Sequence, residues 1–168
     1  MSTERKCYNC PLKDAIKVPG YGFSAYPRIM FIAEAPGETE AKTGFPLVGK
    51  SGQLLRRMIK ELGLDDELCY YTNVCICHPE GNKRPTAEMV SICYDGLTEE
   101  IESVCPKLIV TLGNVSAHAV GQYDRGVMSI RGMYRELQLE SGTKVGIIPT
   151  YHPAAVLRSP DLFRDLEQ

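Results

Sequence analysis

The sequence predicts an α/β domain, because apolar runs bounded by turn residues alternate along the chain with stretches of helical spacing. The runs expected to form strands lie at residues 29–33, 68–77, 107–112 and 144–148, and a further strand is expected at 134–139. Helical spacing covers residues 52–62 and 86–104, and shorter helices are expected at 115–120 and after Ser159. Ligands of an open α/β sheet bind beyond the carboxyl ends of its strands, so residues that follow the strands are candidate site residues.

The size and charge of the chain limit the possible classes of protein. A chain of 168 residues is expected to fold as a single domain over residues 1–168. The net charge of −2 excludes a globally basic nucleic-acid binder but leaves room for a local basic patch of the kind that contacts phosphates. The sequence has no run of about eighteen apolar residues, and its charged start lacks the apolar segment of a secretory signal. We therefore expect a cytoplasmic monomer without a membrane partner.

Polar side chains follow three of the predicted strands. Glu34 comes directly after the first strand and opens a segment of about twenty residues, whose glycines and prolines favour a shaped, functional loop. Asn73 lies near the end of the second strand, and His152 follows the last one. A carboxylate, an amide and an imidazole at one sheet edge form a candidate acid/base and recognition site, although Asn73 could instead hold the following turn. In the loop after the second strand, Lys83 and Arg84 could contact phosphates or remain solvated.

The cysteine pattern indicates a metal site. The chain has seven cysteines, and an odd number in a cytosolic protein favours metal ligation over a disulfide framework. Cys7 and Cys10 form a C-x-x-C pair, which can hold one metal ion or one edge of a cluster but can also be two incidental thiols. Cys77 and Cys93 could complete a set of four. Spacing alone leaves Cys69, Cys75 and Cys105 as competitors, although these three are more typical of core thiols.

Three motifs resemble those of the iron–sulfur uracil-DNA glycosylases, which are family 4 of the uracil-DNA glycosylase superfamily. The first motif is Glu34-Ala-Pro-Gly37 with residues 43–49 and 53–55. The second comprises residues 72–74, 77–79 and Asn82, and the third comprises residues 149–155 with Leu157 and Arg158. The motifs follow in the family's order, and the resemblance extends from Cys7 to about residue 160, nearly the whole chain.

The resemblance implies a three-layer α/β domain with a central, mostly parallel four-stranded sheet flanked by helices. It also implies a structural 4Fe–4S cluster that ties down an N-terminal arm, with Cys7, Cys10, Cys77 and Cys93 as ligands. The implied partner is DNA that contains uracil. The implied activity is DNA repair by hydrolysis of the N-glycosidic bond between uracil and deoxyribose, which leaves an abasic site after the base has been flipped into a pocket.

The resemblance also implies roles for individual residues. Asn73 would pair with the polar edge of uracil, and a matched amide there rejects cytosine because two donors would face each other. His152 would donate a hydrogen bond to the anion that develops on uracil O2, and Glu34 would orient or activate water. The remaining residues with implied roles line the uracil pocket or wedge into the DNA in place of the flipped base; the pocket residues are Ala35, Gly37, Phe45 and Leu47, and the wedge residues are Leu157 and Arg158.

The chain departs from the family pattern at two positions in the first motif. Leu47 stands where the family usually has an aromatic residue that stacks on uracil, and Phe45 stands where it usually has a basic residue. Base–aromatic stacking is worth roughly 1–3 kcal/mol, so its loss would weaken binding by about tenfold to a hundredfold. In an extended segment, Phe45 and Leu47 would point to the same side. Our hypothesis is that Phe45 partly substitutes for the missing ring, or that the pocket accepts a different base.

Three alternative functions remain open at the level of the sequence. The chain could be a glycosylase for hypoxanthine, xanthine or a modified pyrimidine, or a DNA-binding relative with little activity. An iron–sulfur electron-transfer protein would explain the cysteines but would leave Glu34, Asn73 and His152 without a role.

Overall fold

The computed structural model describes residue 7, residues 9–23 and residues 25–162. These residues form one mixed sheet of six strands in the order β1-β3-β2-β4-β6-β5. The strands β3, β2, β4 and β6 are parallel, whereas β1 and β5 pair antiparallel with the outer strands β3 and β6. The strand bounds are β1 Tyr21–Gly22, β2 Ile29–Ala33, β3 Cys69–Asn73, β4 Leu108–Leu112, β5 Arg135–Gln138 and β6 Lys144–Thr150.

The predicted count of four strands was therefore wrong, although the parallel centre of the sheet does consist of four. The edge strand β1 has only two residues and lies in a glycine-rich stretch, so it leaves no strand pattern in the sequence. The second strand is also shorter than predicted: β3 ends at Asn73, and residues 74–77 leave the sheet.

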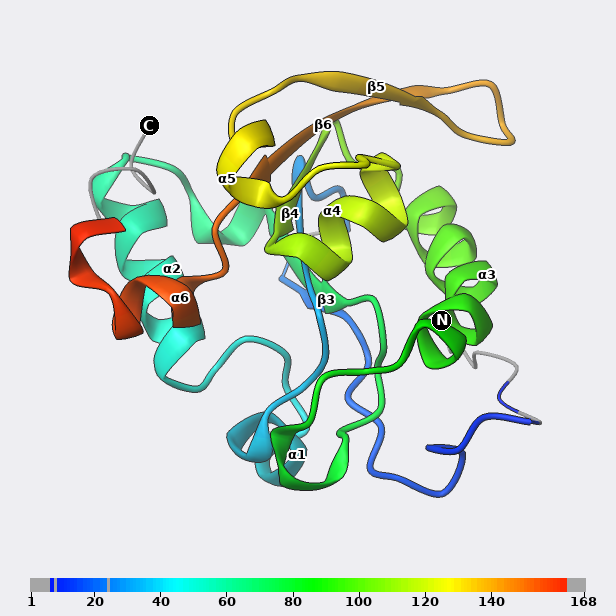
Figure 1. Ribbon diagram of the computed structural model, residues 1–168. Coiled ribbons are helices and arrows are strands. Elements are labelled where there is room, and N and C mark those ends of the chain that lie inside the picture. The colour runs from blue at the N-terminus through cyan, green and yellow to red at the C-terminus, as the bar shows by residue number, and fades with distance from the viewer. Residues whose placement is uncertain (1–6, 8, 24, 163–168) are drawn as a thin grey trace.

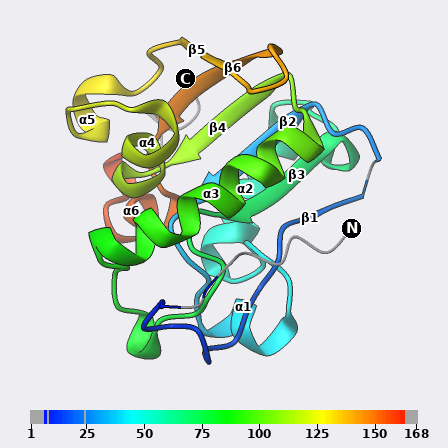
Figure 2. The ribbon, with the colours of Figure 1, turned by 90° about the vertical axis from the view of Figure 1, so that its right-hand side faces the viewer.

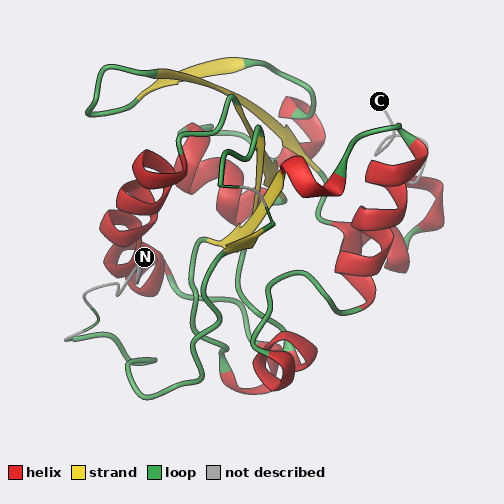
Figure 3. Cartoon of the chain, turned by 180° about the vertical axis from the view of Figure 1, so that it is seen from behind, coloured by secondary structure: helices red, strands yellow, loops and turns green. Residues whose placement is uncertain are grey.

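Helices cover both faces of the sheet, so that the domain has three layers (Figure 1; Figure 3). The helices α3 and α4 lie on one face, and α2 lies on the other together with α6, which packs against it (Figure 2). The α-helix bounds are α1 Glu38–Thr43, α2 Lys50–Glu61, α3 Ala87–Val104, α4 Asn114–Gly121, α5 Val127–Ile130 and α6 Pro153–Arg158. Short 3₁₀ helices span Asp66–Leu68, Glu80–Asn82 and Pro160–Leu162. None of the helices in the described ranges is long and apolar enough to cross a bilayer.

The alternation of side chains along β2 explains the two hydrophobic cores. Met30 and Ile32 pack in the cluster that contains Leu97 of α3 and Ala117 of α4. The alternate side chains of the same strand, Phe31 and Ala33, pack in the cluster on the α2 side. Because successive side chains of a strand point to opposite faces, one apolar run supplies both cores.

Two predicted loops contain helices. The segment after Glu34 includes α1, and residues 126–132 include α5. α1 has six residues and α5 has four, so neither is long enough for a helical period to show in the sequence. The helix expected from residue 86 is present as α3, and Thr86 is its N-cap, since its side chain accepts a hydrogen bond from Met89 N. The final turn at Pro160–Leu162 is a 3₁₀ helix, and it is preceded by α6, which the sequence analysis missed.

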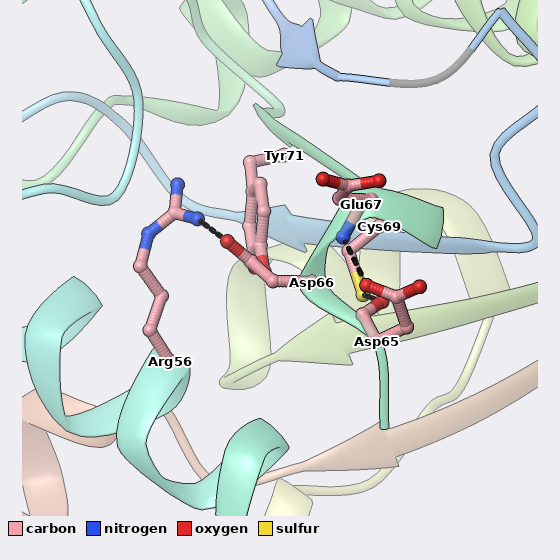
Figure 4. Close-up of polar contacts among 6 residues, drawn as sticks. All are labelled: Arg56, Asp65, Asp66, Glu67, Cys69 and Tyr71. Atoms are coloured by element: carbon pink, nitrogen blue, oxygen red, sulfur yellow. Dashed lines mark hydrogen bonds and ion pairs between the residues drawn. The ribbon is translucent and has the colours of Figure 1, made fainter. Parts of the chain in front are cut away.

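A polar network joins α2 to β3 (Figure 4). Arg56 Nη1 lies 2.6 Å from Asp66 Oδ2, and the Tyr71 hydroxyl donates to Asp66 Oδ1. The Arg56 guanidinium lies 4.1 Å from the centroid of the Tyr71 ring. The Tyr71 ring also stacks on the Phe31 ring. Burial, and next the hydrogen bond to Asp66, raise the pKa of Tyr71, so its hydroxyl stays protonated and remains a donor.

We predict that Tyr71→Phe lowers the free energy of unfolding by about 1–3 kcal/mol, because it removes the donor to Asp66 and keeps the stacked ring. Urea denaturation of both proteins would measure the difference. A variant as stable as the wild type would show that Arg56 alone satisfies Asp66.

Candidate active site

The parallel strands place the predicted polar residues at one edge of the sheet. Asn73 is the last residue of β3 and lies opposite Ala33, the last residue of β2. Glu34 directly follows β2 and therefore lies close to Asn73 at the sheet edge. His152 follows β6 by two residues. Gly113, just after β4, has φ of +89°, and a Cβ added there would lie 3.2 Å from His152 Cβ. This close approach brings the ends of β4 and β6 together, so the edge carries Asn73, Glu34, Gly113 and His152 in the order of the strands.

The backbone fixes the tautomer of His152. This residue is the N-cap of α6, and its Nδ1 accepts a hydrogen bond from Ala154 N at 3.1 Å. Burial, and next the positive charge of Arg158, lower the pKa of His152 to about 4, while Glu40 acts in the opposite direction. The imidazole is therefore neutral at pH 7 and carries its proton on Nε2. A neutral imidazole in this state can donate one hydrogen bond to a developing anion.

Asn73 is a buried amide at the carboxyl end of the sheet. Its residue is only 2% exposed, because it is enclosed by the neighbouring strand and the loops that follow. A carboxamide presents both a donor and an acceptor in one plane, which matches the polar edge of a planar base.

Glu34 is partly buried and pairs with Arg84, whose Nε lies 3.5 Å from Glu34 Oε1. The sequence analysis left Arg84 and Lys83 as phosphate contacts or solvated charges and did not predict this ion pair. Both basic residues are exposed, so the pair contributes little to stability. It places a positive charge beside the carboxylate at the mouth of the candidate site.

The segment that begins at Glu34 is joined by hydrogen bonds to the segment that follows β3. Cys75 N donates to Glu34 O at 3.1 Å, and His78 Nδ1 lies 2.9 Å from Pro36 O. Further along, Glu38 N donates to Asn82 Oδ1 at 3.1 Å and thereby starts α1. These contacts connect the first and second motifs, so Glu34 and Asn73 are held in one frame.

Glu40 is a positioning residue that the sequence analysis missed. It is buried in α1, and its Oε1 accepts hydrogen bonds from Val48 N at 3.0 Å and from Gly49 N at 2.7 Å. A Cβ on Gly37 would lie 2.8 Å from Glu40 Oε2, so glycine at that position makes room for the carboxylate. A glutamate surrounded by polar residues gives no signal in the hydrophobic pattern, and its glycine neighbours were the only available hint.

The backbone between Phe45 and Leu47 is not extended, and the premise that their side chains point to the same side was wrong. Leu47 has φ of +52° and is 5% exposed, in the core cluster with Phe31 and Tyr71. Phe45 is 47% exposed at the surface. A Cβ at Gly52 would collide with the carbonyl oxygen of Leu47, so glycine at residue 52 allows this turn. Contact of either side chain with a base stays a prediction.

The other residues predicted to contact DNA or the base lie at the rim of the site. Ala35 and Gly37 are partly buried in the segment after β2. Leu157 and Arg158 are exposed at the end of α6, and α6 is the short helix that His152 begins (Figure 1). The wedge role therefore remains a prediction at exposed positions adjoining the histidine.

The four cysteines of the predicted cluster set share one neighbourhood. Cys10, Cys77 and Cys93 are buried, and Cys7 is partly buried. Burial, and next the neighbouring Cys7, Cys93 and Cys10, together raise the pKa of the Cys77 thiol to about 11. Across residues 7, 9–23 and 25–162, however, no three histidine, cysteine or acidic side chains are arranged to hold a metal ion.

Backbone hydrogen bonds tie the N-terminal arm to the segment that contains Cys77. Val18 N donates to Ile76 O at 2.7 Å, and His78 N donates to Ile16 O at 2.9 Å. Lys17 and Cys77 form the intervening antiparallel bridge. Of the competing thiols, Cys69 and Cys75 are buried and Cys105 is exposed.

The fold and this edge of the sheet define an α/β protein with a candidate site at the carboxyl ends of its parallel strands, and sequence comparison identifies its family. The chain belongs to the uracil DNA glycosylase superfamily, whose family model matches residues 19–168. It is 40% identical over 163 residues to the type-4 uracil-DNA glycosylase of Sulfurisphaera tokodaii, and the aligned region covers 90% of this chain and 70% of that protein. It is 40% identical over 171 residues to the type-4 enzyme of Saccharolobus solfataricus, with 98% and 78% covered. The type-4 enzyme of Archaeoglobus fulgidus is 39% identical over 154 residues, with 89% and 76% covered. The resemblance to family 4 is thus confirmed.

The low pKa of His152 predicts a specific pH dependence of stability. The pKa is about 4 in the folded chain and near its ordinary value of 6.5 when unfolded. As the pH falls from 6.5 toward 4, the unfolded chain takes up a proton that the folded chain does not, so the free energy of unfolding declines. His152→Asn keeps a good N-cap but removes the titrating group. Urea denaturation between pH 6.5 and 4.5 should show a smaller loss for the variant, and parallel curves would contradict the prediction.

We also predict that Glu40→Ala frees the loop that Glu40 holds. Two hydrogen bonds to a carboxylate are lost, so the Val48 and Gly49 amides should exchange their hydrogens at least tenfold faster, as measured by NMR. Glu38→Ala is the matched control, because Glu38 lies in the same helix and its side chain forms an exposed ion pair with Lys42. Equal exchange in both variants would show that Glu40 does not hold the loop.

Proposed function

We infer that the chain is a uracil-DNA glycosylase, which removes uracil from DNA during repair. It hydrolyses the N-glycosidic bond between uracil and deoxyribose and leaves an abasic site. The observation that carries this conclusion is the neutral, oriented His152 at the same sheet edge as Asn73 and Glu34, in a chain that matches 70% and 78% of the length of two type-4 relatives.

His152 supplies the donor for the leaving group. As the glycosidic bond breaks, negative charge develops on uracil and positive charge on the sugar. A neutral imidazole that donates from Nε2 stabilises the anion at O2, and its tautomer is already fixed by Ala154 N. Since the pKa is about 4, this donor keeps the same protonation state at all pH values well above 4.

Asn73 selects the base. In the proposed complex, its carboxamide pairs with the O4 and N3–H edge of a uracil that has been flipped out of the DNA stack. Cytosine carries an amino group in place of O4, so it would leave two buried donors facing each other. The burial of Asn73 strengthens this discrimination, because water cannot replace the lost hydrogen bond.

Glu34 acts on the sugar side of the bond. We propose that its carboxylate orients the attacking water and favours the positive charge of the sugar. Lys83 and Arg84 are exposed beside it and can contact phosphates, which positions the DNA strand without reading its sequence. Leu157 and Arg158 occupy the space that the flipped base leaves.

A 4Fe–4S cluster held by Cys7, Cys10, Cys77 and Cys93 fits the chemistry of this donor set. Four cysteines in one neighbourhood disfavour one another's thiolate form, and a bound cluster would supply the positive charge that stabilises thiolate ligands. Leu12 N already donates to Cys10 Sγ at 3.4 Å, as is common around cluster sulfurs. When bound, the cluster would tie the N-terminal arm to the segment between Cys77 and α3.

The function is tested by excision from an end-labelled oligonucleotide with one uracil, followed by hot alkali to cut at abasic sites. We expect cleavage by the wild type and a kcat about a hundredfold to a thousandfold lower for His152→Asn, which loses the donor to the leaving group. Asn73→Ala should lose excision by a comparable factor. His118→Asn is the control, because His118 is exposed and contacts only Arg125 O among the hydrogen bonds described.

The absence of wild-type cleavage would contradict a uracil enzyme. The same assay on hypoxanthine and xanthine would then test for a glycosylase of another base. Binding of DNA without excision of any of these bases would indicate a DNA-binding relative.

A further inference from the structure

Three aromatic side chains form an exposed cluster beside the candidate site, and we call Tyr21, Phe23 and Phe45 the aromatic cluster. The Tyr21 ring contacts Phe23 at 5.1 Å and Phe45 at 5.0 Å between centroids, both in edge-to-face geometry. Phe23 is 59% exposed and Phe45 is 47% exposed. Phenylalanine rings at this exposure contribute little to the core, so their burial does not explain them.

The geometry of the aromatic cluster leaves ring faces open. In an edge-to-face pair, the edge of one ring meets one face of the other, so the pair itself leaves at least one face of each ring uncovered. Phe23 and Phe45 both pack on Tyr21, and both are exposed at the surface. Open aromatic faces at a protein surface are platforms on which planar groups can stack.

The aromatic cluster adjoins the recognition residue through the sheet. Tyr21 of β1 pairs with Tyr71 of β3, which is two residues before Asn73 on the same strand. β1 is the edge strand, so nothing in the sheet lies beyond it (Figure 2). Phe45 belongs to the loop whose end is held by Glu40 through Val48 and Gly49. The aromatic cluster is therefore fixed relative to the uracil site and faces outward from it.

We propose that the aromatic cluster stacks on unpaired DNA bases next to the uracil, so that single-stranded DNA is a preferred substrate. The proposal rests on the function inferred above. A DNA strand that places its uracil against Asn73 has neighbouring bases within reach of the edge strand. Unpaired bases of any kind offer a π-face, so aromatic side chains bind single strands without reading their sequence. Paired bases are already stacked in the duplex and gain nothing from these rings.

Two exposed lysines lie close to the aromatic cluster in the sequence, and their positive charge is complementary to the phosphates of a DNA strand. Lys50 is exposed at the start of α2, five residues after Phe45. Lys17 is exposed on the arm that leads into β1. Basic side chains that flank exposed rings are the usual composition of a single-strand binding surface.

The first test is binding of a fluorescent single strand of thymidines without uracil, measured by anisotropy, with the matching duplex alongside. We expect Phe23→Ala to weaken single-strand binding about tenfold and duplex binding less than twofold. Phe23→Leu should be nearly as weak, because it keeps apolar area but has no ring face. Tyr134→Ala is the control, since Tyr134 is 60% exposed but precedes β5 at the opposite edge of the sheet. It should bind like the wild type.

The second measurement uses only the wild-type protein, so its result does not depend on whether a variant folds correctly. A thymidine strand with one 5-iododeoxyuridine would be cross-linked to the wild-type protein by light, and the attached peptides would be mapped by mass spectrometry. We expect attachment at Tyr21, Phe23 or Phe45. Attachment only elsewhere, or equal single-strand affinity of wild type and Phe23→Ala, would overturn the proposal.

The excision assay separates this proposal from the proposed function. Phe23→Ala should raise the KM for single-stranded uracil DNA about tenfold and leave kcat unchanged, because the ring does not contact the reacting base. If the wild type excises uracil and Phe23→Ala leaves its KM unchanged, the proposed role of the aromatic cluster alone would be overturned. A wild type that binds single strands through Phe23 but excises no uracil would overturn the glycosylase function alone.

Discussion

The site depends on the parallel alignment of β3, β2, β4 and β6. Parallel strands all end at the same edge, so one carboxyl end after another delivers a polar residue to a single place. The register of the strands shows this alignment residue by residue, since Ala33 pairs with Asn73 and Leu112 pairs with Thr150. A slip of one residue in either pair would turn the side chains to the opposite face and separate the amide from the imidazole. The two hydrophobic cores, which need alternate residues of the same strands, prevent such a slip.

Hydrogen bonds hold the loops at this edge, in addition to the apolar packing of residues such as Leu47. Polar groups of the first motif meet polar groups of the second at Glu34, Pro36 and Glu38, and Glu40 closes the following loop from within. Hydrogen bonds are directional, so they fix positions more sharply than apolar contacts do. The His152 imidazole is oriented in the same way, by a backbone amide. Preorganised donors of this type stabilise charge without reorganisation at the moment of reaction.

The sequence predicted the parts of this arrangement that leave a local pattern. Apolar runs located the strands, and strand ends located Glu34, Asn73 and His152, because each of these features lies within a few residues. It did not predict Glu40, the pairing of Glu34 with Arg84, or the helices α1 and α5. Each of these depends on contacts between distant residues or on helices too short to show a period. The conformation of Leu47 was also out of reach, since a positive φ at a leucine is set by its surroundings and not by its own preference.

The turn at Leu47 connects the departure of this chain from its family to the aromatic cluster. The turn directs the residue-47 side chain into the core below the loop, and the ring at residue 45 emerges at the surface against Tyr21. Weaker stacking on uracil lowers the binding energy available at the reacting base. Binding energy gained on neighbouring, non-reacting parts of a substrate can offset such a loss, because it helps to hold the reacting group in place. An aromatic platform for adjacent bases would supply that energy only where the bases are unpaired. The same exchange of residues would then shift the enzyme from duplex DNA toward single strands.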